Sequence, residues 1–127
     1  MGQCYTVVAE LKFGNNDPAA FCDMMKKEAA KRKYLQGEKY DLDNPFDCFK
    51  MITTNNAYTM GDKWEADFDA SYSWSGVLEE VFSSVMELLE DGSYVYVEPD
   101  DYHFVIRKNN NKVEIEWYNP DEDDLSE

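Results

Sequence analysis

The chain has few of the residues from which metal sites and catalytic centres are usually built. Its 127 residues include one histidine, His103, and three cysteines, Cys4, Cys22 and Cys48, none of them in a CxxC pair. So few ligands do not readily make the tetrahedral set of a zinc site, and a His103–cysteine nucleophile pair would have to form in space rather than along the chain. The GxSxG, HExxH, GxGxxG and P-loop patterns are also missing. We therefore expect no catalytic residue, no metal and no cofactor, and predict that the protein is not an enzyme.

Long apolar runs and secretion signals are missing as well. No segment has the length and hydrophobicity of a membrane-spanning helix or a signal peptide, and no N-x-S/T glycosylation acceptor occurs. An odd number of cysteines does not favour a disulfide framework, and chains without one are typical of a reducing compartment. We therefore expect a cytoplasmic protein that does not bind membranes.

Positive charge is scarce in one half of the chain. Residues 1–60 hold eight basic and eight acidic side chains, whereas residues 61–127 hold four basic and nineteen acidic ones, so the second half carries the whole formal net charge of −15. Five basic residues gather in one predicted helix: Lys26, Lys27, Lys31, Arg32 and Lys33. A negative field repels nucleic acid, whose binding depends on neutralising phosphates with lysine and arginine. We therefore predict a basic protein as partner and no direct nucleic-acid binding, although acidity can also serve solubility alone.

Hydrophobic periodicity predicts both strands and helices. In residues 4–13 and 63–70 apolar side chains occupy every second position, which is the pattern of a strand with one buried face. Asp17 and Pro18 are typical of a helix start. The elements predicted along the chain are a strand over residues 4–13, a helix from 18 to 34 or 35, a short helix over 45–52, a strand over 63–70, a helix over 76–90, and strands over 94–98, 102–108 and 112–118. Residues 53–62 are rich in turn formers and are not assigned.

This order of elements, β-α-(short α)-β-α-β-β-β, predicts the α+β class. We expect a mainly antiparallel sheet of about five strands with two main helices packed on one face. A length of 127 residues fits one domain, and a hydrophobic fraction of 43% is enough for a core. We therefore predict a single domain over residues 1–119, followed by an acidic flexible tail over residues 120–127.

Acidic residues mark the predicted partner-binding site. The strand at residues 63–70 has a purely acidic outer face, formed by Glu65, Asp67 and Asp69. Carboxylates at every second position of a strand lie about 6.7 Å apart, so they do not converge on one metal ion. Further carboxylates in the second helix and the last strand would add to their density. The predicted partner-binding residues are Glu65, Asp67, Asp69, Glu79, Glu80, Glu114 and Glu116.

The charge pattern favours an interaction protein over an enzyme. The first hypothesis is an inhibitor that occupies the basic nucleic-acid-binding groove of a nuclease or another nucleic-acid enzyme, as phage or mobile-element proteins of the anti-CRISPR or anti-restriction type do. The second is a toxin-neutralising immunity protein, which would be equally small and acidic. The third is a small ligand-binding domain or enzyme with an aromatic-lined pocket near Tyr72, Trp74 and Trp117.

Overall fold

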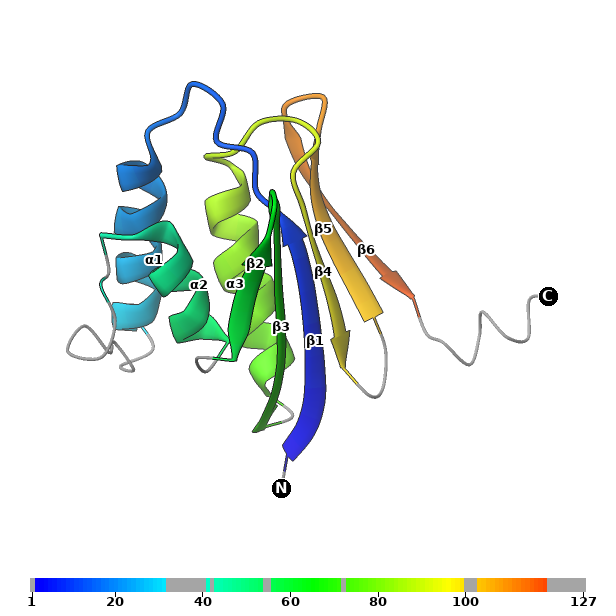
Figure 1. Ribbon diagram of the computed structural model, residues 1–127. Helices are drawn as coiled ribbons and strands as arrows, with labels where there is room; N and C mark the ends of the chain where they lie inside the picture. The colour runs from blue at the N-terminus through cyan, green and yellow to red at the C-terminus, as the bar shows by residue number, and fades with distance from the viewer. Residues whose placement is uncertain are drawn as a thin grey trace.

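A six-stranded antiparallel sheet carries three helices on one of its faces in a computed structural model of the chain (Figure 1). The structure describes residues 2–31, 41, 43–53, 56–71, 73–99 and 103–118. The elements are β1 (Gly2–Glu10), α1 (Pro18–Lys31), α2 (Pro45–Ile52), β2 (Ala57–Met60), β3 (Lys63–Ser71), α3 (Trp74–Met86), β4 (Tyr94–Pro99), β5 (His103–Asn109) and β6 (Lys112–Tyr118). The strand order is β2-β3-β1-β4-β5-β6. The predicted α+β class is confirmed, with six strands where about five were expected.

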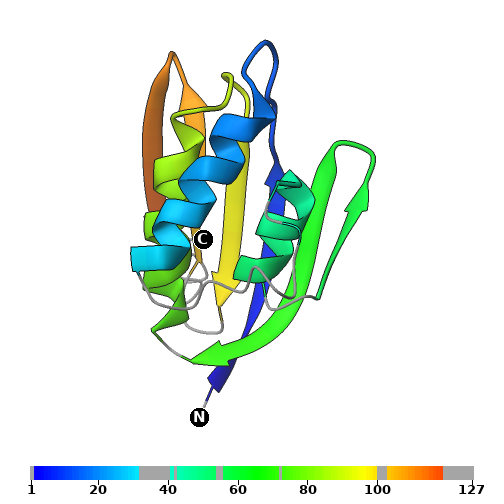
Figure 2. The same ribbon diagram turned by 90° about the vertical axis from the view of Figure 1, so that its left-hand side faces the viewer.

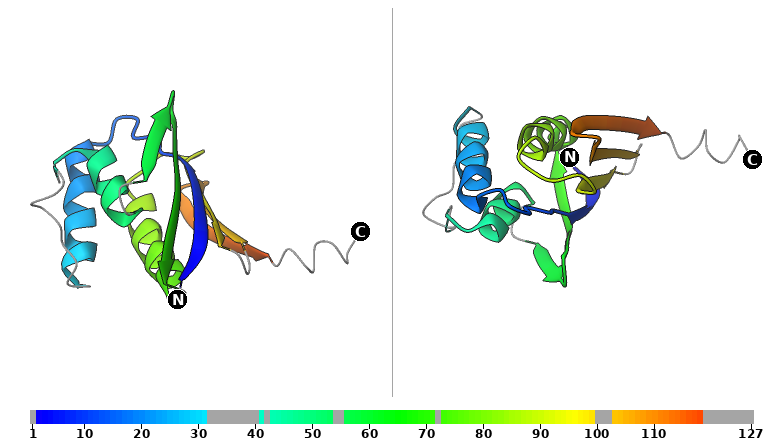
Figure 3. Two further views of the ribbon diagram at one scale, coloured as in Figure 1. Left: turned by 60° about the horizontal axis from the view of Figure 1, so that its bottom comes forward. Right: turned by 90° about the horizontal axis from the view of Figure 1, so that it is seen from above.

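The helices all cover the same face of the sheet, as Figures 2 and 3 show. Strand alternation explains this arrangement, because successive side chains point to opposite faces. In β1, Tyr5, Val7 and Ala9 are buried against the helices, and in register with them on β3 lie Phe68, Ala66 and Trp64. The face opposite the helices is called the open face below.

Two helix starts are capped as their sequences suggest. The Asp17 carboxylate accepts the backbone N–H of Ala19 at 2.9 Å, directly before α1. The Asn44 side chain accepts the N–H of Phe46 at 2.9 Å and opens α2. Such caps satisfy backbone donors that have no partner inside the helix.

Trp64 of β3 joins the first two helices to the sheet. Its ring lies 5.3 Å from that of Phe49 and 5.7 Å from that of Phe46, both on α2. On its other side it lies 6.4 Å from the rings of Phe13 and Phe21, the latter on α1. Edge-to-face contacts of this kind add to the free energy of burial, so this aromatic cluster fixes which face of β3 is buried.

Some predicted boundaries were wrong. The strand β2 was not predicted, because its four residues lie in the turn-rich stretch left unassigned. The helix α3 begins at Trp74, two residues before the expected start, and ends at Met86 rather than at residue 90. β1 also lies earlier than expected and ends at Glu10. The predictions for Arg32, Lys33, Tyr72, Tyr102 and the tail at residues 120–127 fall outside the described residues.

The buried hydroxyl of Tyr5 gives a test of this packing. It donates to the carbonyl of Ser71 at 2.7 Å and accepts the backbone N–H of Ser75 at 3.1 Å. We expect Tyr5→Phe to lower the free energy of unfolding by about 1–3 kcal/mol, because it removes bonds to buried polar groups. Urea denaturation measures this, with Tyr58→Phe as control, since Tyr58 is 49% exposed. Equal effects of the two substitutions would contradict the role of the buried hydroxyl.

Candidate partner-binding face

The open face is covered by no described element, and its side chains form rows across the strands. The register places Lys63, Glu10, Tyr94, Arg107 and Glu114 in one row across β3, β1, β4, β5 and β6. The next row holds Glu65, Val8, Tyr96, Val105 and Glu116. The third holds Asp67, Thr6 and Glu98, and His103 Nε2 lies 3.5 Å from Glu98 Oε1. Asp69 and Cys4 form a fourth.

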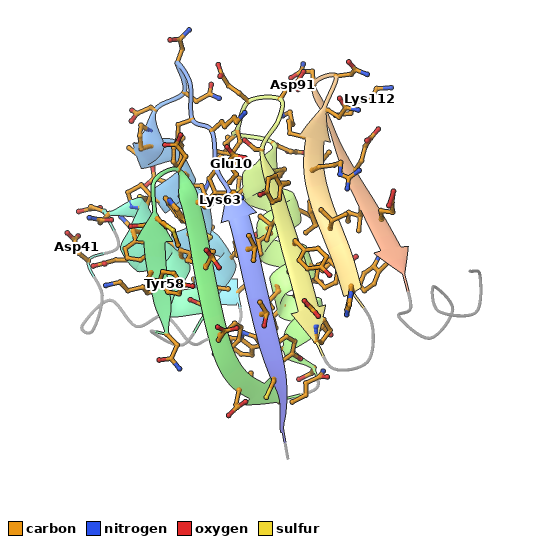
Figure 4. All side chains as sticks on the ribbon, turned by 45° about the vertical axis from the view of Figure 1, so that its right-hand side comes forward. Glu10, Asp41, Tyr58, Lys63, Asp91 and Lys112 are labelled. Atoms are coloured by element: carbon orange, nitrogen blue, oxygen red, sulfur yellow. The ribbon has the colours of Figure 1, made fainter. Side chains whose placement is uncertain are left out.

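Charge is separated along this face. The three cationic side chains of its described residues, Lys63, Arg107 and Lys112, all lie in the first row or beyond it. Figure 4 shows Lys63 and Lys112 near the hairpin turns. Below the first row the described part of the open face holds carboxylates and no lysine or arginine. These carboxylates are called the acidic rows: Glu65, Asp67 and Asp69 on β3, Glu98 on β4 and Glu116 on β6. One end of the open face is therefore mixed in charge and the other is acidic.

The three β3 carboxylates are each held by a donor on a neighbouring strand. Thr6 donates to Asp67 Oδ1 at 2.8 Å, and the Cys4 thiol donates to Asp69 Oδ1 at 3.0 Å, both from β1. On the other side, the Tyr58 hydroxyl of β2 donates to Glu65 Oε1 at 3.2 Å.

All three donors are neutral, so these hydrogen bonds position the carboxylates without pairing them with a cation. Among the described residues, no lysine or arginine lies within 4.0 Å of them. Holding a side chain in place before binding reduces the entropy that binding costs. The three β3 carboxylates thus form a line of positioned anions that no described cation neutralises.

A hollow opens beside this line of carboxylates. Its volume is about 300 Å³, and its lining residues are Cys4, Tyr5, Thr6, Asn56, Asp67, Phe68 and Asp69. It lies where β2 ends its pairing with β3, since β2 covers only the stretch from Lys63 to Ala66. A lysine or arginine side chain of a partner would find the carboxylates of Asp67 and Asp69 on its wall.

The remaining predicted site residues are not all near β3. Glu114 and Glu116 share the open face but lie on β6, four strand spacings or about 19 Å away. Glu79 and Glu80 lie on α3, in the helical layer on the other side of the sheet. The seven residues therefore do not form one continuous surface. Strand order and the side of the sheet taken by α3 decide this, and neither is readable from residue spacing.

Glu98 was missed by the sequence prediction, although it alternates with the buried Val97.

Glu79 and Glu80 belong to a different hollow, between α1 and α3. This hollow, of about 580 Å³, is also lined by Glu28, Lys31, Ser83 and Ser84. Desolvation, with a smaller contribution from the charge of Glu80, raises the pKa of Glu79 above its ordinary value of 4.5.

The expected basic patch on α1 is largely neutralised in its described part. Lys26 pairs with Asp43 at 2.8 Å, and Lys31 pairs with the buried Glu28 at 3.0 Å. Asp23 lies a further 3.9 Å from Lys26. These pairs leave α1 poorly suited to binding an anion through Lys26 or Lys31.

The single histidine lies on the open face in a chain of polar contacts. His103 Nδ1 is 2.9 Å from the Tyr96 hydroxyl, and His103 Nε2 is 3.5 Å from Glu98 Oε1. Cys22 and Cys48 are buried on α1 and α2, on the other side of the sheet, so neither pairs with it. Among the described residues no three histidine, cysteine, aspartate or glutamate side chains are grouped to hold a metal ion.

Tyr72 of the predicted aromatic-lined pocket falls outside the described residues, and among those that the structure describes an aromatic-lined hollow lies elsewhere than at Trp74 and Trp117. A hollow of about 520 Å³ is lined by Tyr94, Tyr96, Val105 and Arg107, together with Gly92, Ser93, Lys108 and Asn109. Trp74 instead donates its ring N–H to the carbonyl of Ile52 at 3.0 Å, and Trp117 packs on Phe104 with ring centres 4.5 Å apart.

No protein-family model, curated protein or solved structure matches the chain. None of the helices in the described residues combines the length and apolarity that crossing a bilayer would need. The function is therefore inferred from the chain's own geometry, above all from the acidic rows and the donors that position them.

The cysteines give a chemical test of the layers. Burial raises the pKa of Cys48 to about 12 and also raises that of Cys22, and the thiolate is the reactive form. We expect a thiol reagent at about pH 8 to modify one cysteine rapidly in the native protein, namely the exposed Cys4. All three should react after denaturation. The variant Cys4→Ser should show no rapid reaction, and a rapidly modified second thiol would contradict the burial.

Glu79 gives a test that depends on pH. Because its pKa is raised in the folded protein, the folded state holds the proton more tightly than the unfolded chain. Stability is therefore lost as the pH rises through the window above 4.5. We expect Glu79→Gln to stabilise the protein at neutral pH and to have little effect near about pH 4. Urea denaturation at both pH values measures this, with the exposed Glu116→Gln as control. An equal gain in the free energy of unfolding at both pH values would contradict the prediction.

Proposed function

We propose that the protein is an interaction module whose acidic rows bind a basic protein partner and occupy the groove with which that partner binds nucleic acid. The observation that carries this proposal is the line of Glu65, Asp67 and Asp69, each held by a neutral donor. An anion that is positioned but not neutralised is matched by a lysine or arginine of a partner. Binding then replaces water on both sides by charge-assisted hydrogen bonds.

The spacing of the acidic rows suits a surface that normally holds phosphates. Neighbouring carboxylates lie about 7 Å apart along β3, and about 10 Å separate β3 from Glu98 on β4. A groove that binds nucleic acid presents several lysines and arginines to the phosphate backbone. Cations spread over such a groove can meet several of these carboxylates at once, whereas a single cation cannot.

The mixed charge at one end of the open face would favour one orientation of the bound partner. A partner that approaches with its cations toward Lys63 and Arg107 meets repulsion, whereas the opposite orientation meets the acidic rows. Charge complementarity of this kind acts on association rate and on specificity more than on affinity alone. An inhibitor of a nuclease, of phage or mobile-element origin, would use it, and so would an immunity protein bound to a basic toxin. The partner's identity distinguishes these two uses of one binding face.

A small-molecule site is the second candidate, and the hollow at Tyr94 and Tyr96 favours it. Arg107 lines this hollow and forms no ion pair with a described residue, so a planar anion would find aromatic walls and a cation there. The hollow lies at the mixed end of the open face, away from the β3 carboxylates. Its occupation would therefore not need the acidic rows.

Charge reversal on β3 tests the proposed function. The protein would be immobilised and used to capture partners from a lysate of the likely host, at low and at high salt. We expect a nucleic-acid-binding protein to be captured at low salt only. When this protein is added to the purified partner with its nucleic acid bound, we expect the nucleic acid to be released. The triple variant Glu65→Lys, Asp67→Lys, Asp69→Lys should bind at least about a hundredfold more weakly.

The control is a second triple variant with the same change in net charge. Asp23, Asp62 and Glu87 are exposed carboxylates outside the acidic rows, and their reversal to lysine should weaken binding far less. Circular dichroism and urea denaturation check that both variants fold. A partner that is retained at high salt and is indifferent to the β3 reversal would sink the proposal.

A further inference from the structure

The outer edge of β6 ends the sheet, and no described element pairs with it (Figures 1 and 3). β6 has seven residues, whereas β2 at the opposite edge has four. Short edge strands limit unwanted pairing, but a long regular edge presents a row of unpaired backbone N–H and C=O groups to another strand.

The side chains of β6 alternate between apolar and acidic. On the helix side, Ile115 is 39% exposed and Trp117 is 44% exposed. The contacts of α3 with the sheet lie mainly on β4 and β5. On the open face, Glu114 and Glu116 are exposed. One edge thus combines a backbone with which no described strand pairs, an apolar strip and two carboxylates.

We propose that β6 binds an extended basic segment of the partner by strand addition, and that this segment alternates apolar and cationic residues. The inference rests on the proposed function in one respect, namely that the partner is basic. It adds the edge at which the partner binds and the sequence pattern that the edge selects.

The pattern follows from the geometry of sheets. A strand added beside β6 places every second side chain on the same face as its neighbour on β6. Apolar residues of the segment then cover Ile115 and Trp117, and the residues between them lie opposite Glu114 and Glu116. Opposite charges in such cross-strand positions stabilise the pair, and like charges destabilise it. Lysine or arginine is therefore selected at those positions.

A second copy of the chain is a poorer occupant of this edge. If two β6 strands paired antiparallel over their full length, centred on Ile115, Glu114 of each copy would lie opposite Glu116 of the other. Each copy also carries a net charge of −15. Both terms oppose self-pairing, and both favour a cationic strand.

The test uses defined peptides and the full chain. The probe is a synthetic peptide of alternating lysine and valine, of about eight residues to match a typical strand. Two control peptides have the same composition and charge: one groups its lysines and valines in two blocks, and the other is N-methylated at every residue. We expect the alternating peptide to bind more tightly than either control. Alternate backbone amides of β6 should become protected from hydrogen exchange when it binds.

Matched variants distinguish binding at the β6 edge from the general attraction of a basic peptide to an acidic protein. The double variant Glu114→Lys, Glu116→Lys should lose up to about tenfold in affinity for the lysine peptide. It should gain affinity for a peptide of alternating glutamate and valine. The control, Asp23→Lys, Asp62→Lys, makes the same change in net charge at exposed carboxylates outside the acidic rows and outside β6. It should change peptide affinity much less and should not reverse the preference.

Several results would overturn the inference. These are equal binding of the alternating, blocked and N-methylated peptides, equal weakening by the control and β6 variants, amide protection at β2 instead of β6, or a β6-paired dimer of the chain alone. The proposed function fails separately, by loss of competition with nucleic acid or indifference to the β3 reversal. If the peptide adds to β6 but the proposed function fails in this way, the inference about the β6 edge still holds.

Discussion

Burial of only one face of the sheet is the constraint on which the rest of the structure depends. Trp64 makes this visible, because its ring meets Phe46 and Phe49 of α2 and Phe21 of α1 and so seats both helices on β3. Since side chains alternate along a strand, the same packing turns Glu65 and Asp67 to the open face. A shift of β3 by one residue would place these carboxylates in the core and Trp64 in water. The position of the acidic rows is therefore as strongly determined as the core itself.

The local signals in the chain were enough for most of the elements. Alternation in residues 63–70 identified β3 and assigned its two faces correctly, and Asp17 before Pro18 marked the start of α1. β2 was missed for a physical reason. Its four residues form a strand because a turn at Gly61, with a φ of 63°, returns the chain to pair with β3. A short edge strand is specified by its partner and not by its own pattern.

The site was only partly accessible to such reasoning, because it depends on strand order. Alternation alone places Glu114 and Glu116 on one side of their strand, but only the order of the sheet shows that they lie four strands from Asp67. The donors that hold Asp67 and Asp69 come from β1, which is far from β3 in the sequence, whereas the donor to Glu65 comes from the adjoining strand β2. The face taken by Glu79 depends likewise on how α3 packs. Contacts between distant segments are set by the whole fold and leave no local signature.

Composition says less about function than the arrangement of charge does. The described open face has about the same proportion of acids to bases as the whole chain, so net charge alone does not distinguish it. Its distinguishing feature is separation, with Lys63 and Arg107 in the first row and carboxylates below. At physiological ionic strength charges are screened beyond about 8 Å, which is close to the spacing between neighbouring carboxylates on this face. A partner docked on this face would therefore respond to the individual rows more than to the total of −15. An acidic chain that served solubility alone would have no need of hydrogen bonds that hold its carboxylates in line.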